Sequence, residues 1–150
     1  PNTPAKICEG MTALCCGEDV CQERVCEVTS LLEAAGKVEK VDEKLMDCVT
    51  AVSGSGPAYA FMFIEAMADA AVKFGMPRKQ AYIYAAQTLK GAASMVLQEE
   101  QNPAALKDAV CSPAGTTIEA VAALEKYGFR NAVIEAVTAA HDKSVAMGKK

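Results

Sequence analysis

The sequence has no tryptophan, only four tyrosines and four phenylalanines, and a single histidine, His141. Its net charge is -4, and no cluster of Lys and Arg is interleaved with aromatic residues, so the electrostatic footprint of a nucleic-acid binder is missing. The longest unbroken apolar run, 58–64, is ended by Glu65 and is far shorter than the ~20 residues that cross a bilayer. Neither nucleic acid nor a membrane is expected as a partner, and no signal peptide is expected.

The cysteines do not form a recognisable framework. There are seven of them, an odd number, and none are spaced as C-x-x-C. We therefore expect free thiols that serve as small hydrophobic side chains in a reducing cytoplasm, and no metal site. The positions are Cys8, Cys15, Cys16, Cys21, Cys26, Cys48 and Cys111.

Residues 1–42 have mixed character. They open on an extended segment between Pro1 and Pro4, and two short strands are predicted, "MTALCC" at 11–16 and "KVEKV" at 37–41. Gly36 is predicted to stop the helix between them. Because two strands and one helix are not stable alone, they are expected to be the last pieces of an α/β sheet. The apolar face of the helix consists of Val25, Val28, Leu31 and Leu32.

From residue 43 onward the pattern is helical, with Gly and Pro at the boundaries. Asp42 is a good N-cap for a short helix to about Ala51, and 57–75 reads as a long helix with Pro57 just inside its start. Further helix starts are predicted at Pro77 and Asn102–Pro103, and a separation between the last two helices at Gly128.

The helix at 57–75 has one charged stripe, formed by Glu65, Asp69 and Lys73, and is otherwise almost entirely apolar. In the next helix the small residues at 91–93 leave room for close approach of a neighbouring backbone. A domain of ~110 residues has too few neighbours to cover such a helix, so we expect a helical homodimer with an extensive interface.

Two glycine-rich stretches, "SGSGPAY" at 53–59 and "SPAGTT" at 112–117, match neither the phosphate loop nor the dinucleotide fingerprint. Each places a hydroxyl-bearing turn before a helix, where free N–H groups favour an anion, although plain helix caps explain them as well. "TTIE" reads as a capping box with Thr116 as N-cap and Glu119 reaching back, which leaves the Thr117 hydroxyl uncommitted. His141 has no Ser or Cys at a recognisable spacing, and no catalysis is assigned to it.

Three segments in order, "PNTPAKICEGMTAL", "LMDCVTAVSGSGPAYAFMFIEAMADAAVKFGMPRKQA" and "VCSPAGTTIEAVAALEKYGFRNAVIEAV", resemble the C-terminal part of the pyrroline-5-carboxylate reductases. The resemblance covers essentially the whole chain. It implies a mainly α fold: residues 1–42 as the C-terminal remnant of a Rossmann-type dinucleotide-binding domain, and 43–150 as a helical dimerisation and substrate-binding domain.

The activity implied is reduction of 1-pyrroline-5-carboxylate to L-proline, the last step of proline biosynthesis, in the cytoplasm. NADPH or NADH is the implied cofactor, held mostly by a glycine-rich fingerprint that this sequence lacks, so the chain alone is not expected to reduce anything. The implied assembly is a homodimer through the helical domain, and a decamer occurs in the family.

The resemblance also assigns roles to residues. Ser112 and the N–H groups of Gly115 and Thr116 are expected to hold the substrate carboxylate, and Thr117 to hydrogen-bond the ring nitrogen. Glu100 matches a carboxylate near the active site, and Asn2 matches a residue near the nicotinamide.

The substrate loop departs from the usual family form at Ala114, where relatives carry the first of two glycines after the proline. Alanine does not adopt a positive φ at low cost, so a role that depends on a left-handed turn at this position is not carried over from the family.

Two other interpretations remain. The chain could be an autonomous helical dimerisation module without activity. It could also be the helical C-terminal domain of a β-hydroxyacid dehydrogenase, in which Lys73 or Lys90 would have to be the catalytic lysine, although neither adjoins a polar loop.

Overall fold

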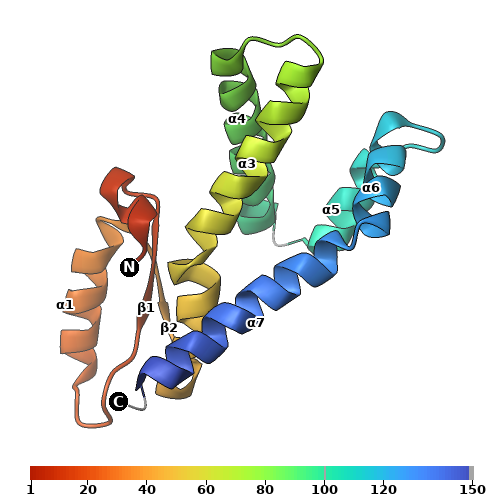
Figure 1. The fold of residues 1–150 in the computed structure, drawn as a ribbon. Helices are drawn as coiled ribbons and strands as arrows, with labels where there is room; N and C mark the ends of the chain where they lie inside the picture. The colour runs from red at the N-terminus through yellow and green to blue at the C-terminus, as the bar shows by residue number, and fades with distance from the viewer. Residues whose placement is uncertain (100, 149–150) are drawn as a thin grey trace. The chain divides into compact units, whose positions relative to one another are not determined.

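The computed structural model describes residues 1–99 and 101–148, and it is mainly helical (Figure 1). Two compact units are present: Pro1–Tyr59 together with the chain from Ile134 on, and Ala60–Val133. The first elements are the 3₁₀ helix η1 (Thr3–Ile7), strand β1 (Gly10–Leu14), helix α1 (Gln22–Glu33), strand β2 (Gly36–Lys40), the 3₁₀ turn η2 (Glu43–Leu45), helix α2 (Met46–Val49) and the π-helix η3 (Thr50–Gly54). There follow α3 (Gly56–Lys73), α4 (Arg78–Glu99), α5 (Pro103–Val110), α6 (Thr116–Lys126) and α7 (Phe129–Gly148).

β1 and β2 pair in parallel, with α1 connecting them, so the predicted strand–helix–strand order and the predicted fold class are confirmed. Gly10 lies opposite Gly36, and a Cβ on Gly36 would come within 2.1 Å of the Gly10 carbonyl oxygen. Glycine is therefore required where the two strands begin. Gly36 also has a φ of 138°, which other residues rarely adopt.

Only part of the predicted apolar face of α1 is buried within this chain. Val25 is buried, whereas Val28 and Leu31 are exposed. The extended segment predicted at the N-terminus is wrong, because residues 3–7 form a 3₁₀ helix with Asn2 at its N-cap. The fixed φ of Pro4 suits the first turn of such a helix as well as it suits an extended chain.

The short helix predicted from Asp42 to about Ala51 is divided into η2, α2 and the π-helix. Asp42 occupies the N-cap position but makes no side-chain capping bond. The π-helix leads into α3, where Pro57 has no N–H to give the Ser53 carbonyl, its partner four residues back. The Asn2 side chain supplies the missing donor: its Nδ2 lies 2.9 Å from the Ser53 oxygen, and its Oδ1 accepts from the Met11 N–H at 2.9 Å.

Helices α3 and α4 pack through alanines. Ala68, Ala81 and Ala85 are buried, and Ile64 and Met67 are among the partly buried side chains around them. The charged stripe predicted on α3 is engaged at Asp69, which pairs with Arg78; that hydrogen bond and charge raise the pKa of Arg78. Gly91 is not a point of close approach within the chain, because a Cβ there would meet nothing within 4 Å.

The predicted helix boundaries at Pro57, Pro77, Pro103 and Gly128 are confirmed to within two residues. Asn102 caps α5, accepting from the Ala104 N–H at 2.9 Å. In the described part of the chain no large side chain is fully buried, no helix is long and apolar enough to cross a membrane, and all seven cysteines are free.

The Asn2 bridge predicts a measurable stability effect. In the protein that carries this chain, Asn2→Ala removes both hydrogen bonds and leaves the Ser53 carbonyl without a donor, and should lower the free energy of unfolding by about 1–3 kcal/mol. Asn2→Asp keeps an acceptor for Met11 but loses the donor, so it should also destabilise. Urea unfolding at fixed protein concentration measures both. Thr3→Ala, at an exposed neighbour, should change stability by less than ~0.5 kcal/mol; equal effects at positions 2 and 3 would contradict the bridge.

Candidate functional site

The stretch from Cys111 to Gly115 connects α5 to α6 within the second unit, and Thr116 and Thr117 begin α6. α5 ends when the Cys111 N–H bonds to the Asp108 carbonyl at 3.0 Å. Its last cation, Lys107, donates to the Asp108 carboxylate at 2.6 Å, and this hydrogen bond, with the charge of Asp108, raises the pKa of Lys107. The loop itself carries no charged side chain.

Residues 112–115 form a tight turn. The Gly115 N–H donates to the Ser112 carbonyl at 3.0 Å, and Ala114 has a φ of 56°. Ala114 is therefore in the left-handed region, which alanine adopts only at a cost. Pro113 holds its own φ negative, and the positive φ at the next residue makes the turn type II.

Ser112 lies directly over Gly115. A Cβ on Gly115 would be 2.3 Å from the Ser112 Oγ and 3.1 Å from the Ser112 carbonyl oxygen. No other residue fits at 115 without moving Ser112. The absence of this side chain lets the Ser112 hydroxyl approach the backbone just before α6.

Helix α6 begins at Thr116, with Gly115 in extended conformation as its N-cap and no side chain capping it. The capping box predicted with Thr116 as N-cap is therefore wrong by one position. Thr116 is the first helical residue and Thr117 the second. Their N–H groups belong to the helix's first turn and have no carbonyl acceptor within the helix.

The hydroxyls of Ser112, Thr116 and Thr117 make no hydrogen bond to any residue among 1–99 and 101–148. Ser112 and Thr116 are exposed and Thr117 is half-buried. The arrangement offers three neutral hydroxyls and the positive end of a helix dipole, which together suit an anion. The Gly115 N–H, expected to be a ligand, is already used in closing the turn.

The other glycine-rich stretch does not form an open helix start. Residues 50–54 are π-helical and lead through Ser55 into α3, with Ser55 N–H bonded to Thr50 O at 2.9 Å and Ala58 N–H to Ser55 O at 3.0 Å. Two of the N–H groups in this stretch are therefore already paired with carbonyls.

Two predicted site residues, Asn2 and Glu100, lie outside the loop in sequence. Asn2 belongs to the first unit and is engaged in the bridge to Ser53 and Met11. Its amide keeps one further N–H and one further lone pair. Glu100 lies outside the described residues. Within those residues no group of three or more His, Cys, Asp or Glu could hold a metal.

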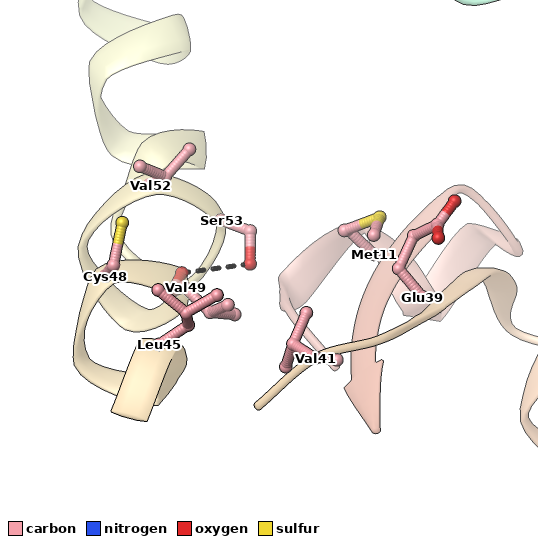
Figure 2. Close-up of a pocket in the computed structure, with 9 residues that line it drawn as sticks. Met11, Glu39, Val41, Leu45, Cys48, Val49, Val52 and Ser53 are labelled. Atoms are coloured by element: carbon pink, nitrogen blue, oxygen red, sulfur yellow. Dashed lines mark hydrogen bonds between the residues drawn. The ribbon is translucent and has the colours of Figure 1, made fainter. Parts of the chain in front are cut away.

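One pocket in the first unit was not predicted. It has a volume of about 300 Å³ and lies between one face of the strand pair and the helical segment 45–53 (Figure 2). Met11 and Ala13 line it from β1, and Glu39 is its one charged residue. The alternation of Met11 with Ala13, and of Glu39 with Val41, is the sequence signal that these side chains share a face.

The comparisons with known proteins agree with one another. A family model described as pyrroline-5-carboxylate reductase dimerisation matches residues 43–147. The chain is 53% identical over 149 residues to a pyrroline-5-carboxylate reductase of Escherichia coli, covering 99% of this chain and 55% of the relative. It is 49% identical over 150 residues to that of Synechocystis, covering 100% of this chain and 56% of the relative.

Solved structures are similar as well. One, of Plasmodium falciparum pyrroline carboxylate reductase with NADP bound, has a TM-score of 0.90 and 40% identity, covering 99% of this chain and 61% of that one. Another, a pyrroline-5-carboxylate reductase from Coxiella burnetii, has a TM-score of 0.92 and 37% identity, covering 97% and 54%.

The chain spans about half the length of the curated relatives it matches. The family model nevertheless covers most of this sequence, and the match to the relatives runs from end to end. The chain belongs to the pyrroline-5-carboxylate reductase family.

Proposed function

We propose that the protein carrying this chain reduces 1-pyrroline-5-carboxylate to L-proline with NADPH or NADH. The observation that carries the proposal is the loop at 112–117: uncommitted hydroxyls and a helix start, with no acid, base or charged nucleophile among them. A reaction that transfers hydride to an imine carbon needs an oriented substrate more than it needs an ionised side chain.

The substrate's carboxylate is assigned to the start of α6. There the Ser112 hydroxyl and the Thr116 N–H donate to it, and Gly115 provides a surface without a side chain at which the ligand can approach. Because the Gly115 N–H is hydrogen-bonded to the Ser112 carbonyl, it does not donate directly to the carboxylate, and it contributes through its dipole. The Thr117 hydroxyl is assigned to the ring nitrogen, whose lone pair takes a proton as the C=N bond is reduced.

The nicotinamide cofactor supplies the hydride when bound. This chain has no G-x-G-x-x-G fingerprint, so its own residues fit only the nicotinamide end, where Asn2 has a spare N–H and lone pair. Glu100 is proposed as a carboxylate near the substrate. In the same proposal residues 1–42 complete a dinucleotide-binding domain, and 43–150 form the helical domain.

We also propose that the helical domain forms a homodimer. In the second unit α3, α6 and the start of α7 enclose an apolar groove of about 730 Å³. Leu124 and Tyr127 on its wall are 42% and 83% exposed, and Phe63 contacts Phe129 with ring centroids 5.7 Å apart. The matching family model is a dimerisation domain, which makes a second copy the partner that this groove fits.

Loss of the Thr117 hydroxyl tests the assignment of the ring nitrogen. In the full-length protein Thr117→Ala should lower kcat/KM for 1-pyrroline-5-carboxylate by ~10-fold or more. This is the scale expected for losing a hydrogen bond to a group that becomes charged, here the ring nitrogen. Thr117→Ser keeps the hydroxyl and should stay within a few-fold of wild type. Steady-state rates of NADPH oxidation measure both, and wild-type kinetics in Thr117→Ala would rule the assignment out. An assembled protein without any reductase activity would instead favour an inactive dimerisation module.

A lysine in the groove tests the dimer. Leu124→Lys places a charge among apolar side chains, and burying it in an interface costs enough to favour the monomer. Sedimentation velocity over a range of concentrations should show dissociation at concentrations where the wild type is assembled. Ala122→Lys adds the same charge to an exposed position of the same helix outside the groove, and should dissociate less. Equal dissociation of the two variants would show that this groove is not the interface.

A further inference from the structure

The turn before α6 is held in a conformation that its own residue disfavours. The Gly115 N–H bonds to the Ser112 carbonyl, so residues 112–115 form a four-residue turn with Pro113 and Ala114 at its centre. Proline fixes a negative φ at the first central position, and Ala114 has a φ of 56° at the second. This combination is a type II turn, in which the second central residue is ordinarily glycine or asparagine.

A second turn is open to the same four residues. In a type I turn proline occupies the same position, the Ser112–Gly115 hydrogen bond is kept, and the second central residue has a negative φ. Alanine prefers this second conformation, because its Cβ crowds the backbone when φ is positive. The two forms differ by a rotation of the Pro113–Ala114 peptide plane.

The side chain of Ala114 does not resist that rotation by packing, because Ala114 is exposed, as is Pro113. The rotation reverses the directions of the Pro113 carbonyl and the Ala114 N–H, while the Ser112–Gly115 hydrogen bond is kept. The polar groups that the loop presents beside the Ser112 hydroxyl and the start of α6 therefore depend on the backbone state of residue 114.

We propose that Ala114 is a positioning residue that sets the fraction of molecules whose loop is ready to bind the substrate carboxylate. The inference rests on the proposed function, since it concerns the same loop. In the type II form that the structure shows, the Ser112 hydroxyl lies over the start of α6. The apparent affinity is then the intrinsic affinity reduced by the population of that form, and residue 114 changes KM while it leaves the chemical step alone.

A substitution series at 114 in the full-length protein tests this role. Tolerance of positive φ falls in the order Gly, Asn, Ala, Val. KM for 1-pyrroline-5-carboxylate should rise in the same order: it should fall severalfold in Ala114→Gly, fall less in Ala114→Asn, and increase in Ala114→Val by up to about 10-fold. kcat should stay within about twofold throughout, because no group that contacts the reacting atoms is changed.

Ala105→Gly is the matched control, at an exposed position inside α5. It should lower the Tm, because glycine weakens a helix, and leave KM unchanged. Ala114→Gly should not lower the Tm, since it relieves the positive φ. This opposite behaviour separates positioning from a general effect of glycine on stability.

A KM that is the same in the Gly, Asn and wild-type proteins, or that rises in Ala114→Gly, overturns the positioning role; so does a series in which kcat moves and KM does not. If Ala114→Val does not fold, the Gly and Asn variants still decide. The effect of Thr117→Ala in the same assay reports separately on the proposed function. A flat series at 114 beside an impaired Thr117→Ala would refute the role of Ala114 and leave the reductase assignment standing.

Discussion

The burial of α3 is the constraint on which the rest of this structure depends. The helix is apolar around most of its circumference, yet within its unit it meets α4 mainly through the small side chains Ala68, Ala81 and Ala85. Alanine contacts allow two helices to approach closely but bury little area per residue. Larger side chains such as Phe61 and Met62 stay exposed in the single chain. Apolar surface of this extent is typical of a protein that completes its core by association.

A second constraint acts where α3 begins. Pro57 starts the helix well, but it removes the N–H that the Ser53 carbonyl needs. The amide of Asn2 replaces that donor and bonds in addition to the first residues of β1, so one side chain joins the strand pair to the helical segment before α3. The bridge from Asn2 thus compensates for the donor that this proline removes.

Much of the fold could be predicted because its signals are local. Proline and Asn102 act on the turn in which they stand, so the starts of α3, α4 and α5 follow from the sequence. The π-helix could not be predicted from local signals, because the carbonyl of its residue Ser53 accepts a hydrogen bond from Asn2, which is 51 positions away in the sequence. In the loop, the residues were identified by resemblance. The helix start was misplaced by one residue, because the extended Gly115 takes the N-cap position that a threonine such as Thr116 favours on its own. The positive φ of Ala114 goes against the local preference of alanine, so the residues around it do not predict it.

The neutrality of the loop suits the proposed substrate. As its ring nitrogen gains a proton, 1-pyrroline-5-carboxylate carries a negative carboxylate and a positive nitrogen within one small ring. A lysine or arginine in the loop would attract the first and disfavour the second. The hydroxyls and the helix N–H groups of 112–117 can orient both the carboxylate and the ring nitrogen of the substrate. The neighbouring cation, Lys107, is paired with Asp108. Fixed dipoles bind the carboxylate without opposing the charge that develops on nitrogen, so the binding energy of this loop is available to the transition state as well as to the ground state.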